Sequence, residues 1–113
     1  MKENKIWGNT SLIWAGNNTE VHRIKIDKGC YCSKHKHESK WNYFFVERGE
    51  LVIEIWNESG IVDETVLTDG ESTSVPPGIY HKFTSVKETE ALEIYYVYLK
   101  SNDIIRETTG GRL

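Results

Sequence analysis

Three histidines are spaced in a way that suits one metal ion. His35 and His37 are two residues apart, so on an extended chain their side chains face the same side. His81 begins another strand-like segment after a proline-rich turn, and could complete the site if that segment lies beside the first. Neutral imidazoles bind zinc, iron, nickel, copper and manganese. We predict that these three residues hold a divalent transition metal, although composition alone favours solvated or core histidines.

Two cysteines precede this histidine pair. On an extended chain the Cα atoms of Cys30 and Cys32 lie roughly 6 to 7 Å apart. A disulfide needs Cβ atoms within about 4.5 Å, so we expect no bond between the two. On one continuous strand their parity also turns the sulfurs away from the imidazoles. We predict packing residues rather than zinc ligands, unless the chain bends at Gly29 or Ser33.

The elements that must position these groups are strands. Segments rich in branched and aromatic residues alternate with turn signals, and no helical period is sustained. Gly49 is predicted to be a turn between two of these segments, and 57–60 is predicted to be a hairpin loop. About eight or nine short strands are typical of an all-β sandwich or barrel. The predicted strands are 11–14, 21–26, 43–46, 51–56, 61–67, 72–75, 81–84 and 91–99.

Size and charge narrow the classes of function. The 113 residues suffice for a single domain, 1–113, with a core at about 20–100 and a loosely packed tail at 101–113. The net charge of −3 and the lack of a basic cluster argue against a nucleic-acid partner. No apolar run reaches the length of a signal peptide or of a membrane span. We therefore expect a cytoplasmic protein with no membrane partner.

Two motifs around the histidines resemble those of the cupin superfamily. The resemblance implies a single-domain cupin, a double-stranded β-helix or jelly-roll barrel, with its metal inside. The sequence departs from the family at Asn42, where the first motif has glutamate, and at Ser85, where the second usually has asparagine. The first motif is matched by Gly29, His35, His37, Asn42 and Gly49, and the second by Gly70, Pro76, Gly78, His81 and Ser85.

The departure at Asn42 bears on the metal. An amide offers at most a neutral carbonyl oxygen where the family motif offers a negative carboxylate. We therefore predict weaker metal retention than in a three-His, one-Glu site, and open positions that accept an anionic ligand. Alternatively, Asn42 does not coordinate and hydrogen-bonds a neighbour or the substrate.

A narrower resemblance is to the cupin domain of type II mannose-6-phosphate isomerases. In that family the position of His35 is often glutamine and that of Asn42 is glutamate, so the metal set is rearranged here. The resemblance implies a small polar, sugar-like or anionic substrate, with Arg23 as a substrate-binding residue. The matching segments are Lys5-Ile6-Trp7-Gly8, Gly70-Glu71-Ser72, Val75-Pro76-Pro77-Gly78 and Asp103-Ile104-Ile105-Arg106.

Strand parity supplies further candidates for the pocket. The inward set that contains Asn42 also includes Phe44 and Val46, which makes Asn42 and Phe44 candidates for substrate contact. Glu93 and Tyr95 are predicted to be catalytic, because a carboxylate among apolar strand residues needs a polar reason to be there. Alternatively, their strand lies at an edge with Glu93 in water. Four aromatic residues are expected in walls or dimer contacts, and His22 at the surface; the four are Trp41, Trp56, Tyr80 and Tyr98.

Several functions fit these residues. The leading one is a metalloenzyme that isomerises or epimerises a sugar or sugar phosphate, with one Zn, Fe, Mn or Ni ion as Lewis acid and Glu93 as general base. A ferrous-iron-dependent dioxygenase is a competing version. A non-catalytic module that binds a sugar or small acid is the alternative from another class, and an empty cupin with a role in assembly is a third. Exposed strand aromatics predict a homodimer.

Overall fold

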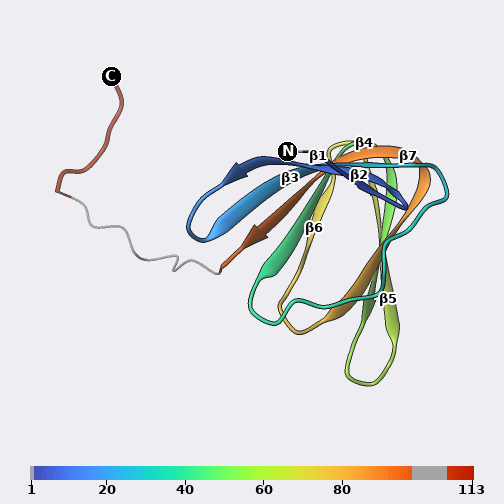
Figure 1. The fold of residues 1–113 in the computed structure, drawn as a ribbon. Coiled ribbons are helices and arrows are strands. Elements are labelled where there is room, and N and C mark those ends of the chain that lie inside the picture. The colour runs from blue at the N-terminus through green and yellow to red at the C-terminus, as the bar shows by residue number, and fades with distance from the viewer. Residues whose placement is uncertain (1, 98–106) are drawn as a thin grey trace.

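The protein is a single curled sheet of antiparallel strands (Figure 1). This computed structural model describes residues 2–97 and 107–113. The strands follow the order β1-β2-β3-β7-β4-β5, and β6 pairs with β4. The described residues contain no helix, so the predicted all-β class is confirmed. The strands are β1 (Lys2–Lys5), β2 (Gly8–Ala15), β3 (Thr19–Ile26), β4 (Trp41–Trp56), β5 (Val62–Thr68), β6 (Ser72–Val75) and β7 (Tyr80–Tyr96).

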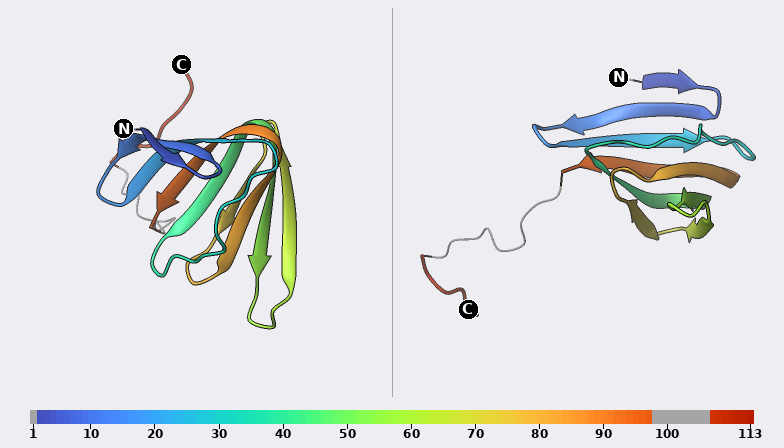
Figure 2. Two further views of the ribbon diagram at one scale, coloured as in Figure 1. Left: turned by 45° about the vertical axis from the view of Figure 1, so that its right-hand side comes forward. Right: turned by 90° about the horizontal axis from the view of Figure 1, so that it is seen from below.

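Two long strands, β4 and β7, run through the bend of the sheet (Figure 2). The first half of β4 pairs with β6 and with the second half of β7, and its second half pairs with β5 and the first half of β7. The second half of β7 also pairs with β3. β4 and β7 therefore each run through both halves of the curled sheet. Residues from both halves of these strands thus surround one interior.

The predicted turn at Gly49 is wrong. Segments 43–46 and 51–56 form one strand, and so do 81–84 and residues 91–96 of the predicted strand 91–99. The pairing of β4 with β7 slips in register between Val46 and Leu51, and Gly49 has a φ of 121° that favours glycine. The glycine therefore marks a bulge, which bends a strand without ending it.

The same bulge keeps one face of β4 inward. Before it the buried residues have even numbers, Phe44 and Val46, and after it odd numbers, Leu51 and Ile53. The predicted inward parity of Phe44 and Val46 is confirmed. The extra residue changes the parity where the strand crosses from one wall to the other, so both halves contribute to one core.

The other observed strands, apart from β1, overlap the predicted ones and differ from them only at their ends. The hairpin loop at 57–60 is confirmed, and its Asn57 Oδ1 accepts hydrogen bonds from the N–H groups of Ser59 and Ile61, each at 3.0 Å. Strand β1 was not predicted. Residues 107–113 form no strand. Tyr98 and the segment 103–106 lie outside the described residues.

Candidate metal centre

The three predicted histidines come together. His35 and His37 lie on the segment 27–40 between β3 and β4, and His81 lies near the start of β7. One ligand nitrogen from each lies within 4.8 Å of the other two. The ring centroids of His35 and His81 are 4.5 Å apart, and that of His37 is 5.1 Å from the first and 5.5 Å from the second. This spacing suits one ion between the three rings.

Backbone pairing fixes this arrangement. The N–H of His35 donates to the carbonyl of His81 at 3.0 Å, and the N–H of His81 donates back at 2.8 Å. The N–H of Gly78 donates to the carbonyl of His37 at 2.7 Å. His35 and His37 thus converge although the segment is not a regular strand, because it is attached to β7 through its backbone.

In two of the rings, Nδ1 is hydrogen-bonded to a backbone carbonyl group. Nδ1 of His35 lies 2.7 Å from the carbonyl oxygen of Ser33, and Nδ1 of His81 lies 3.0 Å from that of Ile79. A carbonyl oxygen only accepts, so each Nδ1 carries a hydrogen, and in the neutral ring of His35 Nε2 carries the lone pair. Nε2 of His81 faces Oδ1 of Asn42 at 3.1 Å, so it offers a lone pair when the Asn42 amide is turned to present Nδ2 to the ring. Such second contacts are typical of histidines that bind metals.

The third ring has an unpaired nitrogen. Nε2 of His37 is buried and has no hydrogen-bond partner within the described residues. Burial lowers the pKa of His37 to about 4, and the positive forms of His35 and His81 add to this shift. Burial also lowers the pKa of His81. The lowered pKa values of His37 and His81 favour the neutral forms that metal ligands must have, and a divalent ion would satisfy the orphaned nitrogen.

Asn42 lies beside this cluster. Its side chain is 1% exposed, and Oδ1 lies 3.1 Å from Nε2 of His81. Its Nδ2 has no hydrogen-bond partner among the residues that the structure describes. The amide therefore stands next to a predicted ligand atom with one end unsatisfied, in a position to serve as a fourth donor.

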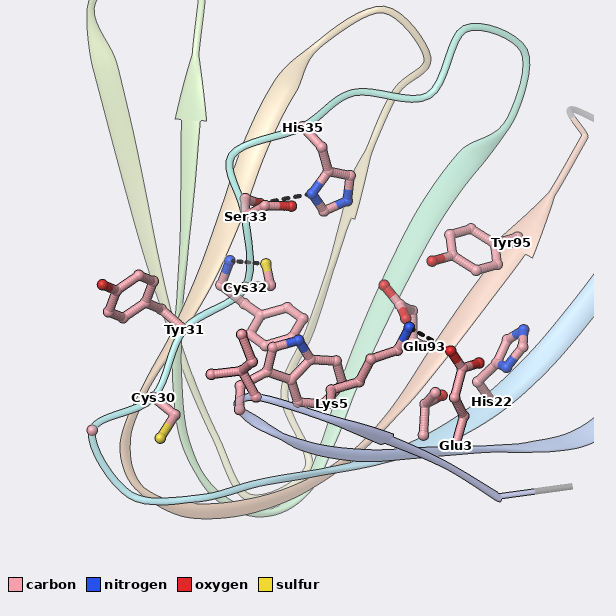
Figure 3. A pocket seen from close by; sticks show the side chains of 15 residues that line it. Glu3, Lys5, His22, Cys30, Tyr31, Cys32, Ser33, His35, Glu93 and Tyr95 are labelled. Atoms are coloured by element: carbon pink, nitrogen blue, oxygen red, sulfur yellow. Dashed lines mark hydrogen bonds and ion pairs between the residues drawn. The ribbon is translucent and has the colours of Figure 1, made fainter.

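A cavity of about 800 Å³ borders the cluster through His35 (Figure 3). Glu93 and Tyr95, the predicted catalytic residues, both line it. They lie on β7, which is flanked by β3 and β4, so Glu93 is not on an edge strand. The ring of Tyr95 is 5.1 Å from that of His37. The cavity is lined by Glu3, Lys5, Ile6, Trp7, Thr10, His22, Gly29, Cys30, Tyr31, Cys32, Ser33, His35, Phe83, Glu93 and Tyr95.

Burial raises the pKa of two acidic side chains in this cavity wall, Glu93 and Tyr95. Glu93 is 8% exposed, and burial raises the pKa of its carboxyl group, while the side chains of Asn42 and Tyr95 oppose the shift. Burial and the nearby charge of Glu93 raise the pKa of Tyr95 as well. A carboxyl group with a raised pKa holds its proton more tightly than an exposed one, which favours a role in proton transfer.

Two predicted substrate-binding residues lie elsewhere. Arg23 makes ion pairs with Glu47 at 3.1 Å and with Glu90 at 3.6 Å. Phe44 is 1% exposed in the core, with its ring 6.3 Å from that of His81. Neither residue lines the cavity. Arg23 is held by its acidic neighbours, and Phe44 supports the histidine from behind.

The sequence analysis missed several residues of the cavity wall. His22 was expected at the surface, but its side chain is only 18% exposed and its ring is 5.6 Å from that of Tyr95. It has the same parity as the buried Ile24, a signal that could have found it. Trp7 was missed because the first residues of the chain fold back beside β3 through strand β2.

Neither cysteine belongs to the group of metal-ligating side chains that the three histidines form in the described residues. Cys30 and Cys32 line the same cavity as His35, because the segment 27–40 is not one continuous strand. Both are free thiols. The sulfur of Cys32 accepts a hydrogen bond from the N–H of Phe83 at 3.2 Å, and burial raises the pKa of this thiol to about 11.

Solved structures share the fold at low sequence identity. KdgF from Halomonas sp. matches with a TM-score of 0.75 and 13% identity, over 88% of this chain and 89% of that chain. Oxalate decarboxylase from Bacillus subtilis matches with a TM-score of 0.77 and 14% identity over 86% of this chain, which spans only 27% of the decarboxylase. An oxalate oxidase in complex with glycolate matches with a TM-score of 0.66 and 20% identity, over 71% of this chain and 42% of that one.

Comparison of sequences identifies the family. A search among curated proteins finds no match. In the described part of the chain, no helix has the length and apolar character needed to cross a membrane. The profile of the cupin domain matches residues 22–98, which include all three histidines, Asn42 and Glu93. With this match and the jelly-roll fold of its strands, the chain belongs to the cupin superfamily.

Proposed function

We propose that this protein is a metal-dependent cupin enzyme that moves a proton on a small, oxygen-rich anion, with sugar or sugar-phosphate isomerisation or epimerisation as the leading reaction. One observation carries the proposal. The buried carboxyl group of Glu93, with its raised pKa, lines the same cavity as His35 of the histidine cluster. A proton-transfer group and a metal position thus border one cavity.

The residues have distinct roles in this reaction. His35, His37 and His81 hold the metal, with Asn42 as fourth donor. When bound, a divalent metal polarises a carbonyl or hydroxyl oxygen of the substrate as a Lewis acid. Glu93 removes the proton from the substrate and returns it. Tyr95, which lies beside both His37 and Glu93, orients the carboxylate and excludes water.

The charge of the site favours an anionic substrate. Three neutral imidazoles and a neutral amide leave the charge of a divalent ion uncompensated. Lys40 adds a further positive charge, with its Nζ 4.1 Å from the ring centroid of Tyr95. The oxalate oxidase among the structural neighbours is in complex with glycolate, a small acid. A carboxylate or phosphate group on the substrate is therefore expected to face the histidines.

Metal analysis and turnover test this proposal together. Protein purified without a histidine tag should contain about one ion per chain. His35→Ala and His81→Ala should lose it, and His22→Ala, which removes a cavity histidine outside the cluster, should keep it. Glu93→Gln should keep the metal but lose roughly a hundredfold or more in turnover of sugar phosphates or hydroxy acids. A protein that refuses added metal, or a Glu93→Gln variant with full turnover, contradicts the proposal.

The neutral residue at Asn42 favours a second candidate, a non-catalytic module that binds the same anion. In that case the protein binds metal and ligand but turns over none of the sugar phosphates or hydroxy acids. Oxygen consumption distinguishes a ferrous-iron-dependent dioxygenase from the isomerase and from the binding module. Only the dioxygenase takes up O₂ when it is loaded with iron and supplied with ligand.

We also propose a cytoplasmic homodimer, with neither a nucleic acid nor a membrane as partner. The net charge is −3, and Leu12, Ile13 and Trp14 are exposed together on β2, with Trp14 55% exposed. Covering these side chains in a second copy would remove apolar surface from water. Sedimentation should show a dimer that Trp14→Asp weakens. Val66→Asp, at an exposed site on β5, should leave it intact. A wild-type protein that is monomeric at all concentrations contradicts the dimer.

A further inference from the structure

The wall of the cavity points to a more specific class of substrate. We propose that the substrate is amphipathic, with an anionic head at the end formed by His35, Glu93 and Tyr95, and an uncharged aromatic or branched apolar tail against Ile6, Trp7 and Tyr31. This inference rests on the proposed function for the head group. The tail is carried by separate observations.

The first observation is the size of the cavity. Its volume is about 800 Å³, within the range of roughly 300 to 1,000 Å³ that holds ligands of drug size. An acid of two or three carbons would occupy only a small part of this space. Most of the cavity is therefore available to a part of the ligand that does not touch the metal ligands.

The second observation is apolar surface that the protein leaves in water at the cavity. Tyr31 is 62% exposed and Ile6 is 101% exposed, although both line the cavity. Apolar area of this kind gains about 25 cal/mol per Å² when a ligand covers it. A ligand that carries a hydrophobic portion beside its polar head gains this free energy.

The third observation is the separation of the polar and apolar ends. Tyr31 and Cys30 lie on one side of the cavity, and Glu93, Tyr95 and His22 lie on the other (Figure 3). A single ligand that touches both ends must therefore differ in chemistry along its length.

Ring packing and a backbone hydrogen bond hold Trp7 in place within the apolar wall. The ring of Trp7 meets that of Phe83 edge to face, with centroids 5.0 Å apart. The carbonyl of Trp7 accepts a hydrogen bond from the N–H of Asp27 at 2.8 Å. Lys5, the one lysine of the cavity wall, pairs with Glu3 at 3.0 Å, so the two charges offset each other. The wall is thus preorganised for a tail without charge.

Two hydroxy acids with the same head test the inference. Lactate and 3-phenyllactate share the carboxylate and the hydroxyl group, and only the second carries an aromatic tail. Calorimetric titration of the zinc-loaded protein should give at least about tenfold tighter binding of 3-phenyllactate, as expected for burial of one ring. Trp7→Ala and Tyr31→Ser should each reduce this preference, measured as the ratio of the two affinities, several-fold.

Controls separate the tail from folding and from the metal. Trp7→Phe should retain the preference, and Trp14→Ala, a tryptophan outside the cavity, should not change it. Equal affinity for the two acids, or a preference that survives both Trp7→Ala and Tyr31→Ser, overturns the inference. A preference that depends on Trp7 but not on zinc supports the apolar tail and contradicts the metal-bound head of the proposed function.

Discussion

Asn42 is the residue whose chemistry most changes the expected metal site. It is buried, with its Oδ1 3.1 Å from Nε2 of His81, at the position where the cupin motif carries glutamate. Asn42→Glu should bind Zn²⁺ roughly 10-fold to 100-fold more tightly, because a negative oxygen replaces a neutral one beside the ion. Competition with a chromophoric chelator measures this change.

The matched control is Asn42→Gln, which keeps the neutral amide and lengthens the side chain. It should give no gain in affinity. If Asn42→Glu binds zinc no more tightly than the wild type, then the residue lies outside the coordination sphere, and its amide serves only to orient His81.

The buried thiol of Cys32 should make the free energy of unfolding depend on pH in the alkaline range. Burial raises the pKa of its thiol from 9.0 to about 11 in the folded protein. Because the folded pKa is the higher one, this contribution to the free energy of unfolding is complete below pH 9 and is lost as the pH rises through about 11, by about 1 kcal/mol per pH unit. Urea unfolding at several pH values should show this loss in the wild type and a smaller loss in Cys32→Val.

Thiol labelling gives an independent measurement of the same residue. Cys32 is 6% exposed, and its sulfur is bonded to the N–H of Phe83, so a thiol reagent at pH 8 should modify it only after unfolding. Modification of both cysteines at equal rates in the folded protein would contradict its burial.

At the scale of elements, the sequence predicted strand positions better than strand continuity. The shared parity of Asn42, Phe44 and Val46 identified the inward face, because period two is a local property. The sequence alone predicts a turn at Gly49, because glycine is common both in turns and in bulges. The difference depends on Thr89 and Glu88 of the partner strand, which lie against the glycine across the sheet. That contact is long-range and is not visible in a window of sequence.

Substitution of this glycine tests the role of the bulge. A Cβ at Gly49 would lie 2.4 Å from Thr89 Oγ1 and 2.7 Å from its Cα, in a backbone with φ of 121°. Gly49→Ala should lower the free energy of unfolding by roughly 2 to 4 kcal/mol, because steric overlap adds to backbone strain. Urea denaturation measures the effect.

Gly60 offers the control, since its φ is also positive, at 83°, but a Cβ there meets nothing within 4 Å. Gly60→Ala should cost only roughly 1 to 2 kcal/mol, from backbone strain alone. Equal losses for the two variants would show that the crowding at Gly49 relaxes without cost.

The candidate site was predictable where it depended on spacing and not where it depended on the N-terminal strands. The spacing of His35 and His37 was enough to predict that they act together. The cavity wall at Trp7 depends on β1 and β2 folding beside β3, a placement that strand parity does not specify. Arg23 was assigned to the substrate by resemblance, and its contacts with Glu47 and Glu90 come from side chains that local pattern cannot pair.

At the scale of the whole molecule, the histidine cluster joins two parts of the chain that are far apart in sequence. The segment 27–40 is held to β7 by backbone hydrogen bonds, from Cys32 N–H to Phe83 at 3.2 Å and from Ser85 N–H to Cys30 at 2.9 Å, as well as through His35. A metal would add side-chain bonds across the same junction. It would therefore stabilise the attachment of segment 27–40 to β7 and not one element alone.

Because metal would bind across this junction, we expect zinc to raise Tm substantially. Free zinc at about 100 times its dissociation constant adds about 2.7 kcal/mol to the folded state, which for a domain of about 100 residues raises Tm by roughly 10 to 20 °C. Differential scanning calorimetry of chelator-treated protein, with and without zinc, measures this shift. His35→Ala should lose the shift, and His22→Ala should keep it. An unchanged wild-type Tm, or an equal rise in His35→Ala, would mean that zinc binds somewhere other than between the three imidazoles.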